Sequence, residues 1–208
     1  MSRTSAPARL PRAGVGGRAC QVITAVAMTA HRGPLARAVA EVAQLTAADR
    51  VVDIGCGPGT AVRHAAGIGA AAVGVDPDPV MLRLAGWITA MRRRPGVSWA
   101  KGQAEKLPLP DGQATVAWAI SSVHHWADRA AGLSEAWRVL APGGRLLLAE
   151  RLIKPGARGP AAHGLTSDQA EELAQQAAAG GFGRVRLEIR QAGRRRLVLV
   201  RGEKGLAA

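Results

Sequence analysis

The sequence predicts an α/β fold: a seven-stranded, mostly parallel sheet with helices on both faces and a C-terminal antiparallel hairpin. Two patterns support this prediction. Short apolar runs typical of buried strands alternate with longer segments of helical period, and clusters of glycine and proline separate them. The length of 208 residues fits one domain with a full core. We therefore expect a single functional site.

The first half of the chain alternates regularly between helix and strand. Leu35, Val39 and Val42 share one helical face, and the apolar run after Arg50 ends in a glycine loop. Helices are expected over residues 34–45, 60–66 and 79–93, and strands over residues 51–55, 71–76 and 97–100.

The second half continues the alternation and closes with a hairpin. Asp128 is a favourable N-cap for a helix ending at Leu140, and Thr166 with Gln169 forms a capping-box pattern for a helix ending at Gly180. The proline and glycines of residues 141–144 end the first of these helices. Strands are expected over residues 115–120, 145–150, 185–189 and 197–200.

Residues 1–30 are predicted to be a flexible basic arm, and residues 31–208 the folded domain. The arm is rich in alanine, proline, glycine and arginine, and its apolar stretch over residues 19–30 is shorter than the roughly 20 residues of a membrane span. Its outline resembles a secretory signal, but the apolar centre is poor. The two cysteines, Cys20 and Cys56, form no disulfide framework, so a cytoplasmic location is expected.

The formal net charge of +13 would attract anionic partners such as nucleic acids. However, the positive charges are scattered, apart from two runs at residues 92–94 and 194–196. The chain has no tyrosine and one phenylalanine beside five tryptophans, which is a small supply of rings for stacking bases. A nucleic-acid partner is therefore possible but less favoured.

The segment VVDIGCGPGT, residues 51–60, is the most informative motif. It places Asp53 in a buried strand and three glycines, Gly55, Gly57 and Gly59, in a tight loop before a helix. Asp76 ends the next strand, about 20 residues further on, where an acid can hold two ribose hydroxyls. The pattern therefore indicates a nucleoside-containing ligand.

Several ordered motifs resemble the class I S-adenosylmethionine (SAM)-dependent methyltransferases, particularly the small type 11 group that includes ubiquinone- and menaquinone-biosynthesis-like enzymes. The resemblance covers roughly residues 30–202 and implies a Rossmann-like fold with SAM as cofactor. The matching segments are VVDIGCGPGT at residues 51–60, VGVDPDPVML at 73–82, GQAEKLPLPDG at 102–112, AWAISSVHHWAD at 117–128 and EAWRVLAPGGRLLLAE at 135–150.

The resemblance implies a role for each matching residue. Asp53 would support the glycine loop and the ammonium group of SAM, and the loop glycines would pack against its methionine part. Gln103 stands where the family usually has an aspartate that receives the adenine amino group; its amide oxygen can accept that hydrogen bond. The cofactor-binding set predicted in this way is Asp53, Gly55, Gly57, Gly59, Asp76, Pro77, Gln103, Ala104 and Ser121.

His124 and His125 follow the fourth strand at its carboxyl end, beside the expected position of the reactive methyl group. Histidine suits proton transfer near neutral pH, so either residue is a candidate base; the alternative is that they only cap or pack the loop. No metal site is expected, because no further ligand pattern accompanies the pair. Glu135 and Arg138 are interpreted as a helix-surface pair without a catalytic role.

The favoured function is methyl transfer to a small-molecule acceptor by a monomer or homodimer. An RNA methyltransferase is one alternative, although SSVHH stands after the fourth strand in place of the N-P-P-Y type of motif. A non-catalytic SAM-binding module is another. A nicotinamide-dependent oxidoreductase does not fit the glycine spacing, and the chain has no tyrosine for a proton relay.

The acceptor pocket is expected to be partly open. The connection over residues 152–165 is short, so we expect the segment around residues 19–31, a second subunit or the substrate itself to cover the pocket. The residues expected to line it are His31, Ser122, His124, His125 and Trp126.

We predict that residues 1–27 are dispensable for folding, because MTAHRGPLARAV reads as a natural start of the domain at Met28. A chain beginning at Met28 should unfold as cooperatively in urea as the full chain and bind SAM equally well. Loss of cooperative unfolding would show that the arm is structural.

Overall fold

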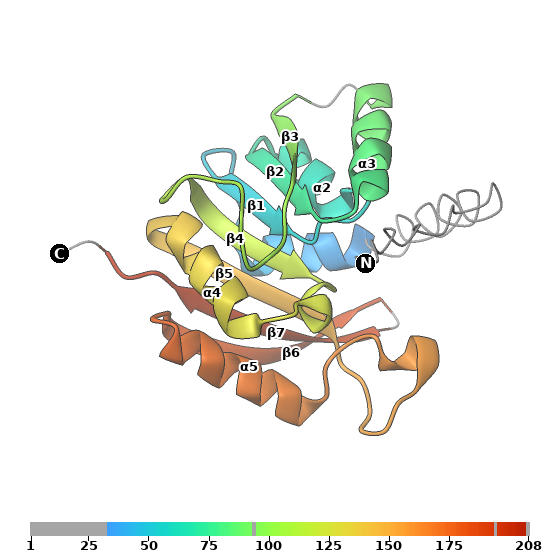
Figure 1. Ribbon diagram of the computed structural model, residues 1–208, viewed down its shortest axis with the longest axis vertical. Coiled ribbons are helices and arrows are strands. Elements are labelled where there is room, and N and C mark those ends of the chain that lie inside the picture. The colour runs from blue at the N-terminus through green and yellow to red at the C-terminus, as the bar shows by residue number, and fades with distance from the viewer. Residues whose placement is uncertain (1–32, 93–94, 194, 207–208) are drawn as a thin grey trace, which may run out of the picture.

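The computed structural model describes residues 33–92, 95–193 and 195–206, and these ranges form one seven-stranded sheet in the order β3-β2-β1-β4-β5-β7-β6 (Figure 1). The predicted arm over residues 1–30 and His31 lie outside the described residues. The strands are β1 (Arg50–Ile54), β2 (Ala71–Asp76), β3 (Val97–Lys101), β4 (Ala114–Ile120), β5 (Leu140–Arg151), β6 (Gly183–Ala192) and β7 (Arg195–Glu203).

The strand pairing confirms the predicted fold class. Strands β1 to β5 pair in parallel, whereas β7 pairs antiparallel with both β5 and β6. The sheet is extended from β1 to β2 and β3 on one side and from β4 to β5 on the other. The connections that follow the parallel strands β1 and β4 therefore lead away to opposite sides. In open α/β sheets this divergence creates a crevice at the carboxyl ends of the strands.

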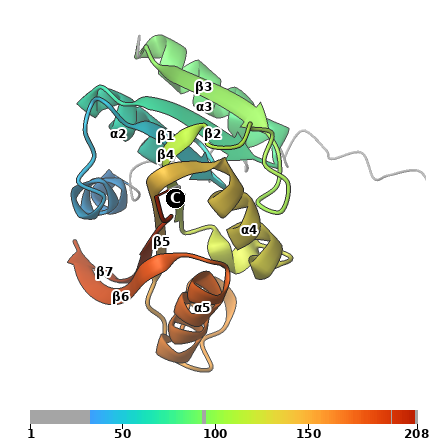
Figure 2. The same cartoon turned by 90° about the vertical axis from the view of Figure 1, so that its left-hand side faces the viewer.

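Helices cover both faces of the sheet, as Figure 2 shows. The helix over residues 33–42, α2 (Thr60–Ile68) and α3 (Pro79–Met91) pack on one face, while α4 (Arg129–Val139) and α5 (Ser167–Ala179) pack on the other. Alternate residues of the central strands enter the two cores: in β4, Ala117 and Ala119 join one, and Trp118 and Ile120 join the other. The fully buried Trp118 makes β4 the centre of the molecule.

The predicted helix caps are present. The side chain of Asp128 accepts a hydrogen bond from the amide of Ala131 at 3.0 Å, and the reciprocal bonds of Thr166 and Gln169 form the capping box. The bounds differ slightly from prediction: α4 ends at Val139, and β5 already begins at Leu140. The strands of the hairpin are longer than expected because their pairing continues beyond the apolar positions.

The first helix ends earlier than its apolar pattern predicts. Helical backbone stops at residue 42, whereas the prediction extended to residue 45. Gln44 adopts the left-handed conformation, with φ of 50°, and the amide of Leu45 bonds back to the carbonyl of Ala40 at 3.0 Å. Leu45 therefore packs on the core although it lies after the helix, in a turn. Its apolar side chain continues the helical spacing of the sequence, which is why a longer helix was predicted.

A buried ion pair joins the amino-terminal ends of three segments. Asp49, just before β1, accepts hydrogen bonds from Arg145 of β5 at 2.8 and 3.0 Å, from the hydroxyl of Thr115 at 2.7 Å and from the amide of Thr46 at 2.8 Å. Burial alone would raise the pKa of Asp49, but Arg145 and the other donors outweigh it and lower this pKa to about 2. The carboxylate therefore stabilises the sheet only while it is ionised.

In the described ranges, no helix is both long and apolar enough to cross a membrane.

We predict that Asp49→Asn lowers the free energy of unfolding by about 2 kcal/mol at neutral pH, since the folded-state pKa lies below the usual value of an aspartate. The stabilisation is complete above about pH 4 and is lost as the pH falls through about 2, so the difference between variant and parent should shrink over that window. Urea unfolding at several pH values measures this difference in the free energy of unfolding. Asp168→Asn, which changes an exposed carboxylate, is the control; a pH-independent difference would contradict the assignment.

Candidate active site

A cavity of about 520 Å³ lies at the carboxyl edge of the parallel strands. Its walls come from the loops that follow β1, β2, β3 and β4, which the reversal of strand order holds apart. This volume is typical of pockets for small organic ligands. The fold therefore places a ligand-sized cavity where the sequence predicted the site.

Most of the predicted site residues meet in this cavity. Those that line it are Gly55, Gly57, Asp76, Pro77, Gln103, Ala104, Ser121 and His125, together with Ser122 and Trp126 of the expected acceptor pocket. Asp53, Gly59 and His124 do not line it. Further lining residues that the sequence analysis did not single out are Asp78, Met81, Gly102, Glu105 and Ala127. Most of these flank motif residues, so the motifs located the right loops.

The glycine loop approaches the end of β4 too closely for a side chain at Gly55. A Cβ atom there would lie 2.5 Å from the Cβ of Ser122, and Gly55 has a φ of 74°. The hydroxyl of the buried Ser122 donates to the carbonyl of Ile54 at 2.6 Å, which ties the ends of β1 and β4 together. The two loops therefore form one rigid floor of the cavity.

Gly59 makes room for a core side chain behind the loop, and its expected contact with the methionine part of SAM stays a prediction. A Cβ atom at this position would lie 2.1 Å from the indole ring of Trp99, which also covers Gly74. Trp99 belongs to β3 and packs on the core behind the loop. The missing side chain at Gly59 thus makes room for a core tryptophan, whereas Gly55 and Gly57 are the loop glycines that line the cavity.

The carboxylate of Asp76 holds the glycine loop against the end of β2. One oxygen accepts from the amide of Gly57 at 2.7 Å, and the other accepts from the amide of Asp78 at 2.9 Å. The residue is 7% exposed and lines the cavity. Because each carboxylate oxygen has two acceptor sites, both retain capacity for a ligand hydroxyl.

Ser121 connects β4 to the cavity through a strained backbone. Its φ is 54°, although it is not a glycine, and its amide donates to the carbonyl of Ala149 at 2.8 Å. Residues in this conformation cost on the order of 1–3 kcal/mol and persist where the surrounding structure holds them. The turn directs the next residues, Ser122 to His125, around the cavity rim, where Val123–His125 form a short 3-10 helix.

The loop after β3 is held by α4, which corrects the interpretation of Glu135 and Arg138 as a surface pair. Glu135 accepts from the amide of Leu107 at 2.7 Å, and Arg138 donates to the carbonyls of Leu107 and Leu109 at 3.1 and 2.8 Å. The two side chains also bond each other at 2.7 Å, and this contact raises the pKa of Arg138 and lowers that of Glu135. The pair clamps the loop that carries Gln103 and Ala104.

The two candidate bases occupy different positions. His125 lines the cavity, whereas the Nδ1 atom of His124 lies 2.9 Å from a carboxylate oxygen of Glu150, a residue of β5 that is only 1% exposed. His124 also lines an adjoining hollow, together with Arg129, Ile153, Lys154, Gly156, Ala157, Ala162, Gly164, Leu165, Thr166 and Gln169. Nearby, the indole of Trp126 packs where Gly132 of α4 has no side chain. The sequence placed both histidines at the cavity edge, and the structure directs one into the cavity and ties the other to the sheet.

The connection between β5 and α5 brings a third histidine to this pair. A bridge between Leu152 and Leu165 closes the loop, and Gly159–Ala162 form a 3-10 turn that places His163 beside His124 and His125. No local pattern in the sequence could have indicated this contact, because it depends on how the loop folds back. The short connection therefore contributes to the edge of the site.

We predict that Arg138→Ala destabilises the fold by about 1–3 kcal/mol, because it breaks a partly buried ion pair and leaves two loop carbonyls without this donor. Urea unfolding gives the loss, and calorimetry with SAM should show weaker binding because the loop after β3 loosens. Arg83→Ala, at an exposed position of α3, should change neither quantity. Equal behaviour of the two variants would mean that the clamp does not hold the loop.

Comparison with known proteins agrees with this architecture. A crystal structure of a SAM-dependent methyltransferase from Aquifex aeolicus superposes with a TM-score of 0.68 at 18% identity, covering 83% of this chain and 92% of that chain. At such low identity the likeness concerns the fold alone. It confirms the predicted Rossmann-like arrangement.

Two curated relatives share the central segment. The 27-O-demethylrifamycin SV methyltransferase of Amycolatopsis mediterranei is 36% identical over 119 residues, which cover 55% of this chain and 43% of the relative. The demethylmenaquinone methyltransferase of Tropheryma whipplei strain Twist is 32% identical over 114 residues, covering 55% of this chain and 46% of the relative. The matches thus span less than half the length of each relative.

The family comparison covers the part of the chain that builds the site. The model of the family described as "Methyltransferase domain" matches residues 52–148, from the middle of β1 to the middle of β5. This range includes the glycine loop, Asp76, the loop after β3, the histidine pair and the Glu135–Arg138 clamp. Over this segment the chain is similar to the methyltransferase-domain family, in agreement with the sequence motifs.

Proposed function

We propose that the protein is a methyltransferase that binds SAM in the central cavity and transfers its methyl group to a small-molecule acceptor. The observation that carries this proposal is the position of Asp76: a buried carboxylate at the end of β2 that faces a cavity floored by side-chain-free backbone at Gly55 and Gly57. This combination favours a nucleoside-containing ligand that lies close to the main chain. The predicted cytoplasmic location is part of the same proposal.

The cavity residues fit SAM in their chemistry. The space above Gly55 and Gly57 admits a flat or extended group, and Asp76 retains acceptor capacity on both oxygens for the ribose hydroxyls. Gln103 and Ala104 lie on the wall formed by the loop after β3, where the side-chain amide of Gln103 and the backbone of Ala104 can bind the edge of a base. The volume of about 520 Å³ is in the range of pockets that bind small organic ligands.

When bound, SAM supplies a methyl group that its positive sulfur already activates. The protein then has to position the acceptor, exclude water and, for an acceptor that must be ionised, take up a proton. His125 lines the cavity and is the candidate base that can reach an acceptor directly. His124 is paired with Glu150 and lines the adjoining hollow instead.

A small acceptor is supported by the relatives. The two relatives described above are named as methyltransferases of 27-O-demethylrifamycin SV and of demethylmenaquinone. These two compounds are therefore the first acceptors to test.

We predict that Asp76→Ala weakens the binding of SAM by about 2 kcal/mol or more, because it removes charge-assisted hydrogen bonds to the ribose and releases the glycine loop. Titration calorimetry with SAM and with its demethylated product measures the loss. Asp168→Ala is the matched control at an exposed position of α5. Unfolding of both variants in urea is followed in parallel, and a folded Asp76→Ala protein with the parent's affinity would contradict the assignment.

Turnover of methyl-labelled SAM separates the function from its alternatives. Transfer of label to either small acceptor supports the proposal. Transfer only to RNA would replace it with the RNA methyltransferase that the charge of +13 keeps open. Tight binding of SAM without transfer to any acceptor would indicate a non-catalytic binding module.

A further inference from the structure

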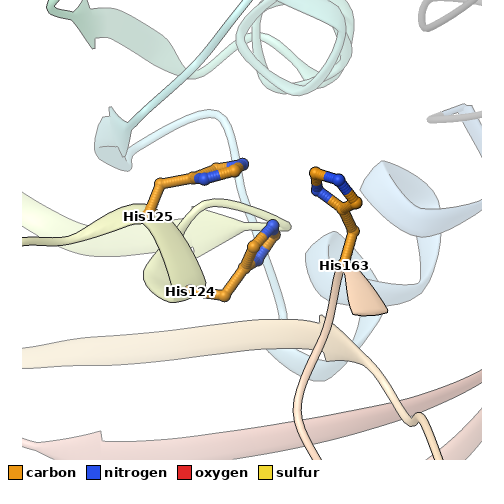
Figure 3. Close-up of side chains that lie close together, drawn as sticks. All are labelled: His124, His125 and His163. Carbon is orange, nitrogen blue, oxygen red and sulfur yellow. The ribbon is translucent and has the colours of Figure 1, made fainter. Parts of the chain in front are cut away.

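Three histidines from two separate segments meet at the edge of the cavity (Figure 3). His124 and His125 come from the 3-10 helix after β4, and His163 comes from the loop between β5 and α5. The ring centroids of His124 and His125 lie 4.0 Å apart, and those of His163 lie 5.5 and 5.7 Å from them. One nitrogen from each ring can be chosen so that all three lie within 4.8 Å of one another.

We propose that His124, His125 and His163 bind a divalent transition-metal ion of the Zn²⁺ type. Imidazole nitrogen is a preferred ligand of such ions, whereas Mg²⁺ and Ca²⁺ favour oxygen ligands. The sequence analysis expected no metal site because only two adjacent histidines were visible, and the fold supplies the third. In the described part of the chain, the nitrogens of these three histidines lie close enough together to bind one ion.

Glu150 prepares His124 as a ligand. Its buried carboxylate lies 2.9 Å from Nδ1, and this pairing leaves Nε2 as the ring nitrogen that can bind an ion. In the described part of the chain this Nε2 atom is buried and has no hydrogen-bond partner. A carboxylate behind a histidine is the usual outer support of a metal-bound imidazole, because it fixes the ring and raises its basicity. The buried Nε2 atom of His124 lies beside the other two imidazole rings, so it gains a partner when an ion binds between them.

The geometry requires only a small closure. Tetrahedral coordination with metal–nitrogen bonds of about 2.0–2.1 Å places ligand nitrogens about 3.4 Å apart. His163 is exposed and follows a short 3-10 turn, so rotation of its side chain can bring its nitrogen closer to those of His124 and His125. Arg129 and Lys154 line the hollow beside His124 and oppose a cation there, while the carboxylate of Glu150 offsets part of that repulsion.

Three protein ligands leave at least one position for water or substrate, as in catalytic zinc sites. Because His125 also lines the cavity, the ion would lie at the acceptor side, where it can bind an acceptor hydroxyl and lower its pKa so that the proton leaves to solvent. This consequence rests on the proposed function; metal binding itself does not. A bound ion occupies the lone pair of His124, so this residue cannot serve as a base at the same time.

Calorimetric titration of Zn²⁺ into the chelator-treated full chain, without a polyhistidine tag, tests the proposal. We expect one ion per chain, and His163→Ala should weaken the affinity by at least about 100-fold, more than the roughly 10- to 100-fold expected when the outer partner is changed in Glu150→Gln. His64→Ala removes a histidine from α2, away from the cluster, and should leave the affinity unchanged. Co²⁺ should give visible absorption bands of a tetrahedral site in the parent and lose them in His163→Ala.

Equal Zn²⁺ affinity of the parent and His163→Ala, or an equal loss in His64→Ala, would overturn the proposal. His163 is exposed and does not line the central cavity, so its replacement should leave SAM affinity, measured without metal, unchanged. That measurement also separates the two proposals. Zn²⁺ binding without SAM binding would remove the proposed function and leave the metal site, and the reverse result would remove only the metal site.

Discussion

The carboxylate of Asp76 is the interaction on which the site depends. It accepts one amide hydrogen bond from the loop after β1 and one from the start of α3, so a single buried group sets the distance between two walls of the cavity. An ionised carboxylate that accepts backbone hydrogen bonds is far more favourable than the same amides left buried without partners. The group that organises the loops also lines the cavity, so the shape of the cavity and its chemistry depend on the same side chain.

The remaining walls are held in the same way: a side chain from one segment forms hydrogen bonds with the backbone of another. Ser122 ties the end of β4 to Ile54, and the Glu135–Arg138 pair holds the loop after β3 from α4. Glu105 joins the loop after β3 to the segment after β4, because its carboxylate accepts hydrogen bonds from the amides of Ala127 and Asp128. Loops between parallel strands have no sheet partners of their own, so these bonds give them the fixed positions that ligand binding requires.

The histidine edge differs from the cofactor side of the cavity. Asp76 and the glycine loop offer a carboxylate and bare backbone, whereas His124, His125 and His163 offer imidazole nitrogens, with the buried Glu150 behind His124. The first arrangement suits a hydroxylated nucleoside, and the second suits a proton or a metal ion. Under the two proposals, the cofactor would be bound by the loops after β1, β2 and β3, and the acceptor would lie beside the loops after β4 and β5.

The sequence alone determined the order of elements and the loops that form the cavity, because apolar period, caps and glycine spacing are local properties. It therefore located Asp76, Gly55, Gln103 and the histidine pair correctly at the carboxyl edge. Tertiary structure decided which residues line the cavity and which support it from outside: Gly59 accommodates Trp99, Arg138 holds a loop, and His163 reaches the histidine pair. Such contacts join segments far apart in the chain, and their distances follow from how the sheet and its loops pack, which no local pattern encodes.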